Sequence, residues 1–326
     1  MFRVAVLDDY QKVALSIADW KILEPEAEVQ AFTDNLVEVP RLAERLHTFD
    51  AAVLMRERTP FPRALFERLP NLRMLVTAGM RNASIDMAAA AEKGVLVTGT
   101  EMLGHPTAEL TWGLILAAAR QIPQQMRSLQ NGTWQTGVGS TVRGKTLGVF
   151  GYGRIGAVVA GYGRAFGMKV LAWARPDSLE RAKKDGHAAA TRKEAFFEQC
   201  DVLSLHMRLV DATRGIVSAE DLARMKPTAI LVNTSRAPLI APGALVAALK
   251  AGRPGWAAVD VYEKEPVRDP KDPLLILPNV VCTPHIGYVS REEYELQFSD
   301  IFDQINSYAA GKPINVVNPD ALKKGR

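Results

Sequence analysis

Cysteine and long hydrophobic runs are what this sequence of 326 residues has least of. It contains 2 cysteines, Cys200 and Cys282, and each lies in an apolar segment typical of a strand. Two such thiols do not make the disulfide framework of a small secreted protein, so they indicate a reducing compartment. The longest apolar stretch, 110–119, is too short to span a bilayer. Because a strand-like run starts at Phe2, we also expect no signal peptide, and hence a cytoplasmic protein with no membrane partner.

A strong charge bias is also absent. The sequence has 40 Lys and Arg residues against 36 Asp and Glu residues, a net charge of +4, and no long basic block. This balance suits an anionic metabolite at least as well as a nucleic acid, and we expect no nucleic-acid partner. Four histidines, His47, His105, His187 and His206, lack the spacing of zinc ligands, so we expect no metal.

The most informative stretch that is present is TLGVFGYGRIG, residues 146–156. An apolar run of strand length precedes a G-x-G-x-x-G turn, and a helical segment follows it. In such a turn the first glycine allows the tight bend, the second allows close approach of a pyrophosphate, and the third allows close helix–strand packing. The pattern therefore predicts a dinucleotide-binding turn, although a purely structural turn gives the same pattern. The expected cofactor contacts are Gly151, Gly153, Arg154, Ile155 and Gly156.

Short strands and helices alternate before this turn, which predicts a parallel sheet covered by helices. The expected strands are 4–7, 29–32, 51–55, 72–77 and 95–98, and the expected helices are 41–47, 64–69 and 87–93. Asp8 and Asp9 close the first strand, where a receiver domain would have an acidic pair, but a solvated pair is the simpler interpretation. After a linker at 99–104, a long Ala- and Leu-rich helix runs from Pro106 to Arg120. Pro123 and the stretch 131–140 then break the pattern.

A second series of strands and helices follows the glycine turn and predicts a doubly wound sheet. The expected strands are 170–173, 202–205, 230–233, 256–261 and 280–283, and the expected helices are 179–184, 193–198, 218–225 and 243–251. A further helix, 291–310, would return the chain to the first domain. The predicted fold class is thus α/β, with a Rossmann-type doubly wound parallel sheet inserted into a flavodoxin-like outer domain. We expect a substrate domain of residues 1–100 plus 291–326 and a dinucleotide-binding domain of residues 101–290.

Polar side chains follow three strands of this second series. Arg236 comes after strand 230–233, Glu265 follows strand 256–261, and His285 follows strand 280–283. Ligands of open α/β sheets bind outside the carboxyl ends of the strands, so the three side chains make a plausible anion clamp with an acid/base pair. Taken singly, each could be a structural or solvated residue of its loop.

Several segments together resemble the signature blocks of the D-isomer-specific 2-hydroxyacid dehydrogenase family. They are residues 146–156, 233–237, 260–266 and 283–287, with Ile85-Asp86 and Thr107-Ala108-Glu109 in the matching places. The resemblance spans nearly the whole chain in the right order. It implies hydride transfer between NAD(P)H and the C2 carbonyl or hydroxyl of a small 2-keto or 2-hydroxy acid.

The resemblance also implies roles for particular residues. Arg236 would hold the substrate carboxylate and keto oxygen, and His285 would donate a proton to the carbonyl during reduction. Glu265 would hydrogen-bond His285 and favour its imidazolium form. Asp260 would orient the nicotinamide carboxamide. The loop that would offer backbone N–H groups to the substrate carboxylate consists of Ala78, Gly79, Met80 and Arg81.

Cofactor choice depends on the end of the strand after the glycine turn. NAD-preferring folds have a carboxylate there, whereas this sequence has Ala174 followed by Arg175, with Asp177 beyond Pro176. We therefore expect NAD or NADP, with NADP slightly favoured. The remaining cofactor contacts implied by the resemblance are Met207, Thr234, Asp260 and His285.

Three residues depart from the family pattern, namely Arg81, Ala237 and the run that starts at Met207. They affect substrate identity and cofactor contacts more than reaction type. We also expect a homodimer that pairs through the helix Pro106–Arg120 and the loop around Trp134, with packing inside one subunit as the alternative. A corepressor-like dinucleotide sensor of the same fold is the main rival, but it would need recognition extensions that the sequence does not show. A nucleotide-binding methyltransferase would not need the Arg236, Glu265 and His285 set.

Overall fold

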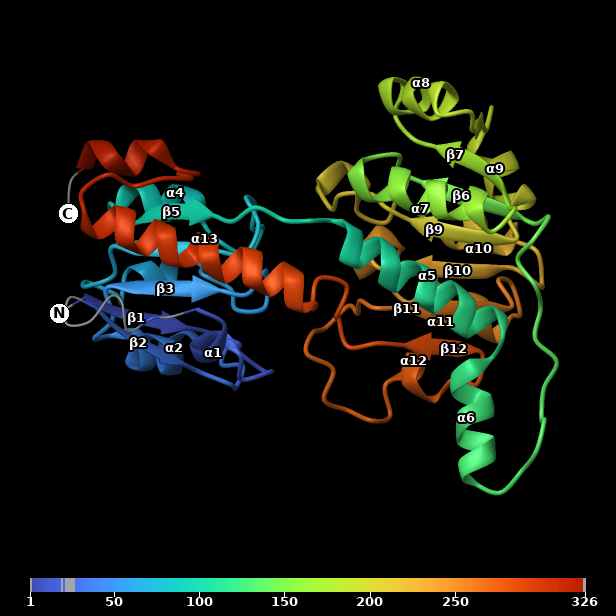
Figure 1. Ribbon diagram of the computed structural model, residues 1–326, viewed down its shortest axis with the longest axis horizontal. Helices are drawn as coiled ribbons and strands as arrows, with labels where there is room; N and C mark the ends of the chain where they lie inside the picture. The colour runs from blue at the N-terminus through green and yellow to red at the C-terminus, as the bar shows by residue number, and fades with distance from the viewer. Residues whose placement is uncertain (1, 19, 21–26, 325–326) are drawn as a thin grey trace. The chain divides into compact units, whose positions relative to one another are not determined.

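The computed structural model describes residues 2–18, 20 and 27–324, which form two α/β units (Figure 1). The outer unit comprises Met1–Leu103 and Ser290–Arg326, and the inserted unit comprises Gly104–Val289. The boundaries expected from the sequence followed residues 100 and 290. Positions 1, 19, 21–26 and 325–326 of the expected outer domain lie outside the described residues.

The outer unit contains a five-stranded parallel sheet with the order β2-β1-β3-β4-β5. Its strands are β1 (Phe2–Val6), β2 (Ala27–Ala31), β3 (Ala51–Leu54), β4 (Met74–Thr77) and β5 (Leu96–Gly99). This is the flavodoxin-like order that the alternation of elements predicts. Every residue of β3, β4 and β5 is buried, because helices cover both faces of a parallel sheet.

The outer unit's helices pack their apolar sides on this sheet. They are α1 (Ala14–Ile17), α2 (Val39–Leu46), α3 (Arg63–Phe66), α4 (Met87–Glu92), α13 (Arg291–Ala309) and the 3₁₀ helix η4 (Pro319–Lys324). The carboxylate of Asp86 accepts a hydrogen bond from the N–H of Ala89 and caps α4. From α13, Phe298, Ile301 and Ile305 are fully buried, so this late segment completes the core of the N-terminal half.

A polar stripe on α13 holds the segment 99–103, which connects the outer unit to the inserted unit. Glu293 accepts a hydrogen bond from the N–H of Leu103 at 3.0 Å, and Asp300 accepts one from the N–H of Glu101 at 2.7 Å. Gln304 donates to the carbonyl of Gly99 at 3.1 Å. These bonds satisfy backbone groups that leave the sheet after β5 and have no strand partner.

The inserted unit contains a seven-stranded parallel sheet with the order β12-β11-β10-β9-β6-β7-β8. Its strands are β6 (Thr146–Phe150), β7 (Lys169–Trp173), β8 (Ala188–Ala189), β9 (Val202–Leu205), β10 (Ile230–Asn233), β11 (Trp256–Val259) and β12 (Val280–Cys282). Strand order reverses between β6 and β9, as in a Rossmann fold. The predicted fold class is therefore confirmed. The short edge strand β8 was not predicted, because its two alanines show no strand pattern.

Helices cover both faces of this sheet (Figure 1). Alternate residues of β6 point to opposite faces: Val149 packs with α5 and α7, and Phe150 packs with α9. The helices are α5 (His105–Ala119), α6 (Ile122–Gln130), α7 (Arg154–Ala165), α8 (Pro176–Lys184), α9 (Lys193–Gln199), α10 (Ala219–Ala223), α11 (Ala244–Lys250) and α12 (Pro273–Ile276), with the 3₁₀ helices η2 (Asp211–Thr213) and η3 (Ala237–Leu239). No helix in these described ranges is long and apolar enough to cross a membrane.

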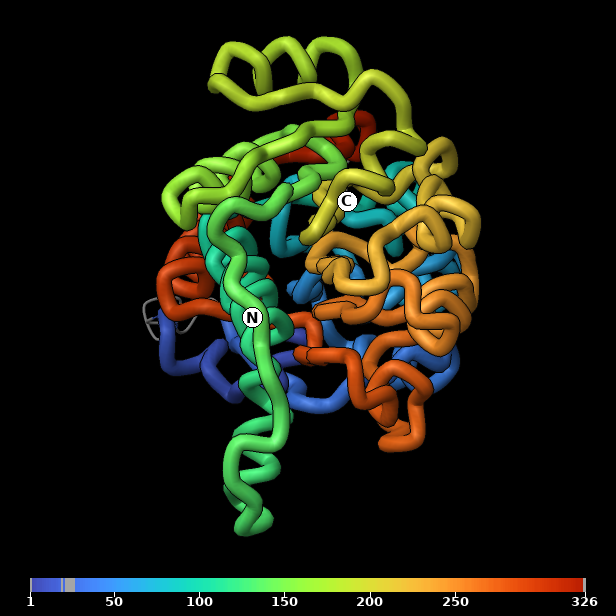
Figure 2. The backbone as a smooth tube through the Cα atoms, turned by 90° about the vertical axis from the view of Figure 1, so that its right-hand side faces the viewer, coloured from blue at the N-terminus to red at the C-terminus, as the bar shows by residue number. Residues whose placement is uncertain are grey.

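Helix α6 corrects one sequence prediction. We expected Pro123 to break the helical pattern, but the break comes earlier, at Gln121, whose φ of 55° is left-handed. Pro123 then lies in the first turn of a second helix, where a missing N–H costs nothing. Figures 1 and 2 show α6 and the segment 131–145 extending away from the other elements of the inserted unit.

Candidate active site

The carboxyl ends of adjacent parallel strands bring the predicted residues of the inserted unit to one edge of its sheet. The glycine turn follows β6, and Arg236 comes three residues after β10. Glu265 and His285 follow β11 and β12, which are neighbours in the sheet. Residues that are far apart in sequence thus share one edge because the strands are parallel and in order.

The glycine turn has the geometry that its residue types require. Gly151 has a φ of 97°, and a Cβ there would lie 2.5 Å from the carbonyl oxygen of His206. A Cβ on Gly156 would lie 2.2 Å from the carbonyl oxygen of Gly151, so α7 packs close to the turn. By contrast, no atom lies within 4 Å of a Cβ built on Gly153. The second glycine therefore leaves open the space that a pyrophosphate would need.

These residues fit a dinucleotide. Helix α7 begins at Arg154, and its N-cap, Gly153, has no side chain that could cap the first turn. The N–H groups of a first helical turn lack intrahelical acceptors and attract an anion. Ile155 packs against the core with Val159, which orients the helix. The Arg154 side chain lies against Gly104, since a Cβ on that glycine would be 3.1 Å from its Nε.

His285 and Glu265 form the polar pair that the resemblance implies. The Nδ1 of His285 and the Oε2 of Glu265 are 2.5 Å apart, and their side chains are 18% and 29% exposed. The other oxygen of Glu265 accepts the N–H of Tyr262 at 2.8 Å, which fixes the carboxylate. The ring of Tyr288 packs edge-on against the imidazole at 5.9 Å. Nε2 is therefore the ring nitrogen that this pair leaves for a substrate.

Arg236 lies at the beginning of η3, in extended conformation, after a turn held by Asn233. The Asn233 amide donates to the carbonyl of Arg236 at 3.0 Å and accepts the N–H of Ser235 at 3.0 Å. One guanidinium nitrogen of Arg236 donates to the Ser235 carbonyl at 2.7 Å. The side chain is half-buried at the same edge as His285. Its role as an anion ligand stays a prediction.

Asp260 is fully buried and holds the loop that carries His285. One carboxylate oxygen accepts hydrogen bonds from the Thr283 hydroxyl at 2.6 Å and the Ile286 N–H at 2.9 Å, and the other accepts the Gly287 N–H at 2.8 Å. Burial raises the pKa of the Asp260 carboxyl, against the lowering effect of these donors and of His285. The geometry shows a loop anchor, and the expected contact with a carboxamide stays a prediction.

The other predicted cofactor residues differ in burial; they are Thr234, Met207, Ala174 and Arg175. The hydroxyl of Thr234 is buried and lies 2.8 Å from that of Thr111 on α5. Met207 packs against the core on the face covered by α9, α10 and α11, and Ala174 packs against the core on the opposite face. Arg175 is exposed at the N-cap of α8. Of these residues, Arg175 is therefore the one whose charged side chain is exposed to solvent.

The predicted substrate loop, residues 78–81, follows β4 in the outer unit. Gly79 has a φ of 87°, and its N–H donates to the Thr100 hydroxyl at 2.8 Å. The guanidinium of Arg56 stabilises the loop by donating a hydrogen bond to the Ala78 carbonyl at 3.1 Å. Met80 and Arg81 are exposed, and among the residues that the structure describes none accepts a hydrogen bond from their N–H groups. Arg56, which the sequence analysis missed, has a φ of 63°.

His206 is a second residue that the sequence analysis did not place in the site. It follows β9, and its carbonyl oxygen faces Gly151 across the glycine turn. Its Nε2 lies 2.8 Å from the Ser204 hydroxyl. Burial lowers the pKa of His206 to about 4, so the ring is neutral near pH 7. Its position directly after a strand was the available signal.

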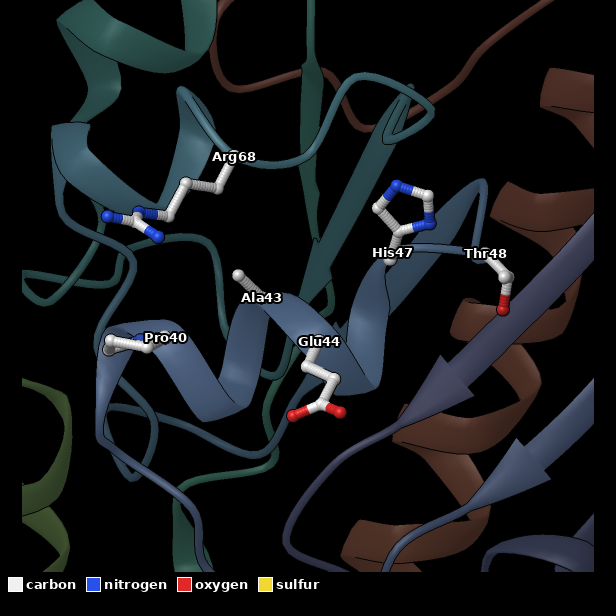
Figure 3. A pocket seen from close by; sticks show the side chains of 6 residues that line it. All are labelled: Pro40, Ala43, Glu44, His47, Thr48 and Arg68. Atoms are coloured by element: carbon white, nitrogen blue, oxygen red, sulfur yellow. The ribbon is translucent and has the colours of Figure 1, made fainter.

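A pocket of the outer unit contains none of the predicted residues. It is lined by Pro40, Ala43, Glu44, His47, Thr48 and Arg68, along α2 and the end of α3 (Figure 3). Across residues 2–18, 20 and 27–324, no three His, Cys, Asp or Glu side chains are grouped to hold a metal ion. The chemistry that the geometry supports therefore lies at the strand ends.

Comparisons with known proteins show the family to which the chain is similar. Residues 112–287 match the family described as D-isomer specific 2-hydroxyacid dehydrogenase, NAD binding domain. A glyoxylate reductase from Aeropyrum pernix is 38% identical over 270 residues, which cover 79% of this chain and 80% of that protein. A D-3-phosphoglycerate dehydrogenase from Methanocaldococcus jannaschii is 37% identical over 98% of this chain, which spans 60% of the length of that relative.

A solved structure is similar in fold as well as in sequence. The crystal structure of a phosphoglycerate oxidoreductase from Vibrio cholerae o395 has a TM-score of 0.92 and 43% identity. The match covers 95% of this chain and 100% of that one. The likeness therefore extends over both units and is not confined to the dinucleotide-binding unit.

The neutral His206 predicts an acid-sensitive fold. Its pKa is lowered in the folded state from an ordinary value of 6.5, so the unfolded chain binds a proton that the folded chain excludes. The contribution of neutral His206 to the free energy of unfolding is fully present above pH 6.5. This contribution, on the order of 2 kcal/mol, is lost as the pH falls toward 4. Guanidinium unfolding at pH 7 and pH 5 should show a smaller loss in His206→Gln than in the wild type. The surface variant His47→Gln is the control, and equal losses in all three proteins would refute the assignment.

Proposed function

Because the chain belongs to the D-isomer specific 2-hydroxyacid dehydrogenase family, we propose that His285, Glu265 and Arg236 carry out its chemistry. The chain is an NAD(P)-dependent oxidoreductase that interconverts 2-keto and 2-hydroxy acids. Its named relatives are reductases and dehydrogenases, which disfavours the corepressor-like alternative. The observation that carries the proposal is the hydrogen bond between His285 and Glu265 at the strand ends.

Each residue has a role that follows from its contacts. A bound nicotinamide supplies the hydride in reduction and accepts it in oxidation. His285 donates the proton from Nε2 to the oxygen at C2, because its Nδ1 is engaged by Glu265. Glu265 stabilises the imidazolium before the transfer and keeps the ring oriented. Arg236 binds the substrate carboxylate and keto oxygen and stabilises the charge that develops on the oxygen.

The outer unit would contribute backbone donors to the substrate carboxylate. The N–H groups of Met80 and Arg81 follow a left-handed glycine, and successive N–H groups in such a turn form an anion-binding nest. Ala78 and Gly79 place the loop through their own hydrogen bonds. The guanidinium of Arg81 would add a positive charge for substrates with a second anionic group.

The 2-keto acid that serves as substrate is best identified by measuring turnover. Purified protein should oxidise NADH or NADPH, followed at 340 nm, with at least one small 2-keto acid. Glyoxylate, hydroxypyruvate and the phosphorylated form of hydroxypyruvate cover the classes that the relatives' names suggest. Absence of turnover with every 2-keto acid and both cofactors would contradict the proposed function.

The acid/base pair makes two variants informative. His285→Ala should lower kcat by roughly a hundredfold or more, with little change in cofactor affinity. Glu265→Gln should move the pH profile of reduction to lower pH, because the imidazolium loses the carboxylate that stabilises it. Steady-state kinetics from pH 5 to pH 9 and fluorescence titration with NADPH measure both effects. His47→Ala, in the pocket of the outer unit, controls for loss of a histidine.

Near-normal turnover in His285→Ala, together with an unchanged pH profile in Glu265→Gln, would remove both residues from the mechanism. Loss of cofactor binding in either variant would show instead that the substitution has disturbed the glycine turn or its neighbours.

NADP is the slightly favoured cofactor. Trp173 ends the strand after the glycine turn, and the next residue, Ala174, brings no carboxylate that would repel a 2′-phosphate. Arg175 follows and is exposed, so its guanidinium is available to a phosphate. Asp177 lies in the first turn of α8, past Pro176.

Substitution of Arg175 tests this preference. Arg175→Ala should lower kcat/KM for NADPH by about tenfold while leaving kcat/KM for NADH nearly unchanged, since one charged hydrogen bond is lost. Initial rates with both cofactors at a saturating 2-keto acid give the ratio. An unchanged NADPH/NADH ratio would mean that Arg175 faces solvent and does not recognise the phosphate.

A homodimer is the proposed assembly, through a surface that keeps the expected loop around Trp134 but uses α6 in place of the helix Pro106–Arg120. Most of α5 is buried inside the inserted unit, so it has little apolar surface left to pair. In contrast, α6 has no buried residue. The large apolar side chains exposed on α6 and in the following segment are Ile122, Met126, Leu129, Trp134 and Val138. Several large exposed apolar side chains on one helix and the segment after it are typical of an interface.

Light scattering should therefore give twice the chain mass at micromolar concentration. Replacing Trp134, which is 74% exposed, by Asp should yield a monomer, because a charge would be buried in an apolar interface. The exposed leucine Leu322, in the outer unit, offers a matched control as Leu322→Asp. A monomeric wild type would rule the dimer out.

A further inference from the structure

Arg181, in the second turn of α8, contacts the glycine turn. Its Nη2 donates to the carbonyl oxygen of Tyr152 at 3.1 Å and to the hydroxyl of Ser178 at 3.0 Å. Tyr152 is the residue between the first two glycines of the G-x-G-x-x-G turn. The guanidinium is thus fixed at the turn, although nearly 30 residues separate the two in sequence.

The guanidinium retains unused donors after these two bonds. An arginine has five N–H groups, and the two bonds both come from Nη2. No described residue accepts a hydrogen bond from Nε or Nη1 of Arg181. These three N–H groups form one side of a planar fork, which matches the oxygens of a phosphate.

The position of Arg181 is the one where the adenine ribose is recognised in folds of this type. The 2′-hydroxyl or 2′-phosphate is bound beside the end of the strand that follows the glycine turn. Here the N–H of Gly151 donates to the carbonyl of Trp173 at 2.8 Å, which joins the turn directly to the end of β7. Arg181 reaches this junction from α8, and the open space above Gly153 stays clear of it.

Two acidic side chains, one on α8 and one at its C-terminal end, already have hydrogen-bond partners. Asp185 accepts the hydroxyl of Tyr152 at 2.6 Å, and Glu180 pairs with Lys183 at 2.7 Å. Asp177 is exposed in the first turn. Within α8, the guanidinium of Arg181 is a charged group that directly hydrogen-bonds the backbone of the glycine turn.

We propose that Arg181 is a ligand of the 2′-phosphate of NADP(H), in addition to its contact with the glycine turn. The inference rests on the proposed cofactor preference and extends it to a residue that follows the strand end by eight positions. Arg175 is exposed and its side chain makes no hydrogen bond to the residues that the structure describes, so binding must order that side chain. Arg181 is already ordered by two bonds, so it loses less side-chain entropy when it binds a phosphate.

A purely structural role of Arg181 predicts a different effect of its loss on nucleotide affinity. If Arg181 only anchors the Tyr152 carbonyl, its loss disturbs the glycine turn and weakens every adenosine nucleotide equally. If it binds the 2′-phosphate, its loss weakens the nucleotide that carries this group and spares the one that does not. The nucleotides 2′,5′-ADP and 5′-AMP differ by that phosphate alone and need no turnover.

Calorimetric titration of the full chain with 2′,5′-ADP and 5′-AMP separates these roles. The wild type should bind 2′,5′-ADP more tightly than 5′-AMP. Arg181→Gln should weaken 2′,5′-ADP by about tenfold or more, the usual cost of a lost charged hydrogen bond, and 5′-AMP by no more than about twofold. Lys184→Gln removes a positive charge from the last turn of the same helix and should leave both affinities unchanged.

Three outcomes would overturn the proposal. Equal weakening of both nucleotides in Arg181→Gln shows anchoring alone, and unchanged affinities show no role. A wild type that binds 2′,5′-ADP no better than 5′-AMP refutes the NADP preference itself, which is distinguishable from failure of Arg181. Should Arg181→Gln be unstable by thermal melting, Arg181→Lys keeps the charge and loses the fork, and the same fall in the 2′,5′-ADP to 5′-AMP ratio is expected.

Discussion

The arrangement of the active site depends on one buried carboxylate, that of Asp260. It ends β11 and accepts three hydrogen bonds from the loop after β12, so two neighbouring strands are joined beyond the point where their own pairing stops. Burial raises the pKa of this carboxyl, and the three donors and the nearby His285 offset that cost. Because the loop is fixed, His285 can adopt a left-handed φ of 54° and still meet Glu265. The geometry of the His285–Glu265 pair thus follows from a buried charge whose hydrogen bonds are satisfied.

Much of the fold and part of the candidate site could be predicted from the sequence, because they depend on local sequence patterns. Apolar runs of four or five residues give the strands, and parallel pairing brings their carboxyl ends to one edge. In the glycine turn, atoms 2.5 Å and 2.2 Å away exclude a Cβ at Gly151 and Gly156, whereas the space beside Gly153 is open. The pairing of His285 with Glu265 was implied by the family resemblance, and both residues follow consecutive, neighbouring strands.

Other features depend on contacts that no local pattern encodes. The helix α6 was missed because the break lies in the backbone of Gln121 and leaves Pro123 free to begin a helix. Arg181 is one of three basic residues near the end of α8, with Lys183 and Lys184, and its bond to Tyr152 sets it apart. Arg56 supports the loop at Gly79 from a different strand end, with a left-handed backbone that its sequence does not suggest. Such positions are selected by tertiary contacts that override local preference.

The polar stripe of α13 has a consequence for the order in which the chain folds during synthesis. The inserted unit is one continuous segment, Gly104–Val289, so all its strands have been made once Val289 has left the ribosome. The outer unit must wait for α13, whose Glu293, Asp300 and Gln304 bind the backbone at 99–103 and whose Phe298 and Ile301 fill its core. Domains generally fold from the N-terminus onward as they emerge, but here the middle of the chain is complete before its beginning. The first 103 residues contain all five strands of the outer sheet, but the apolar surface that α13 buries stays exposed until that helix has been made.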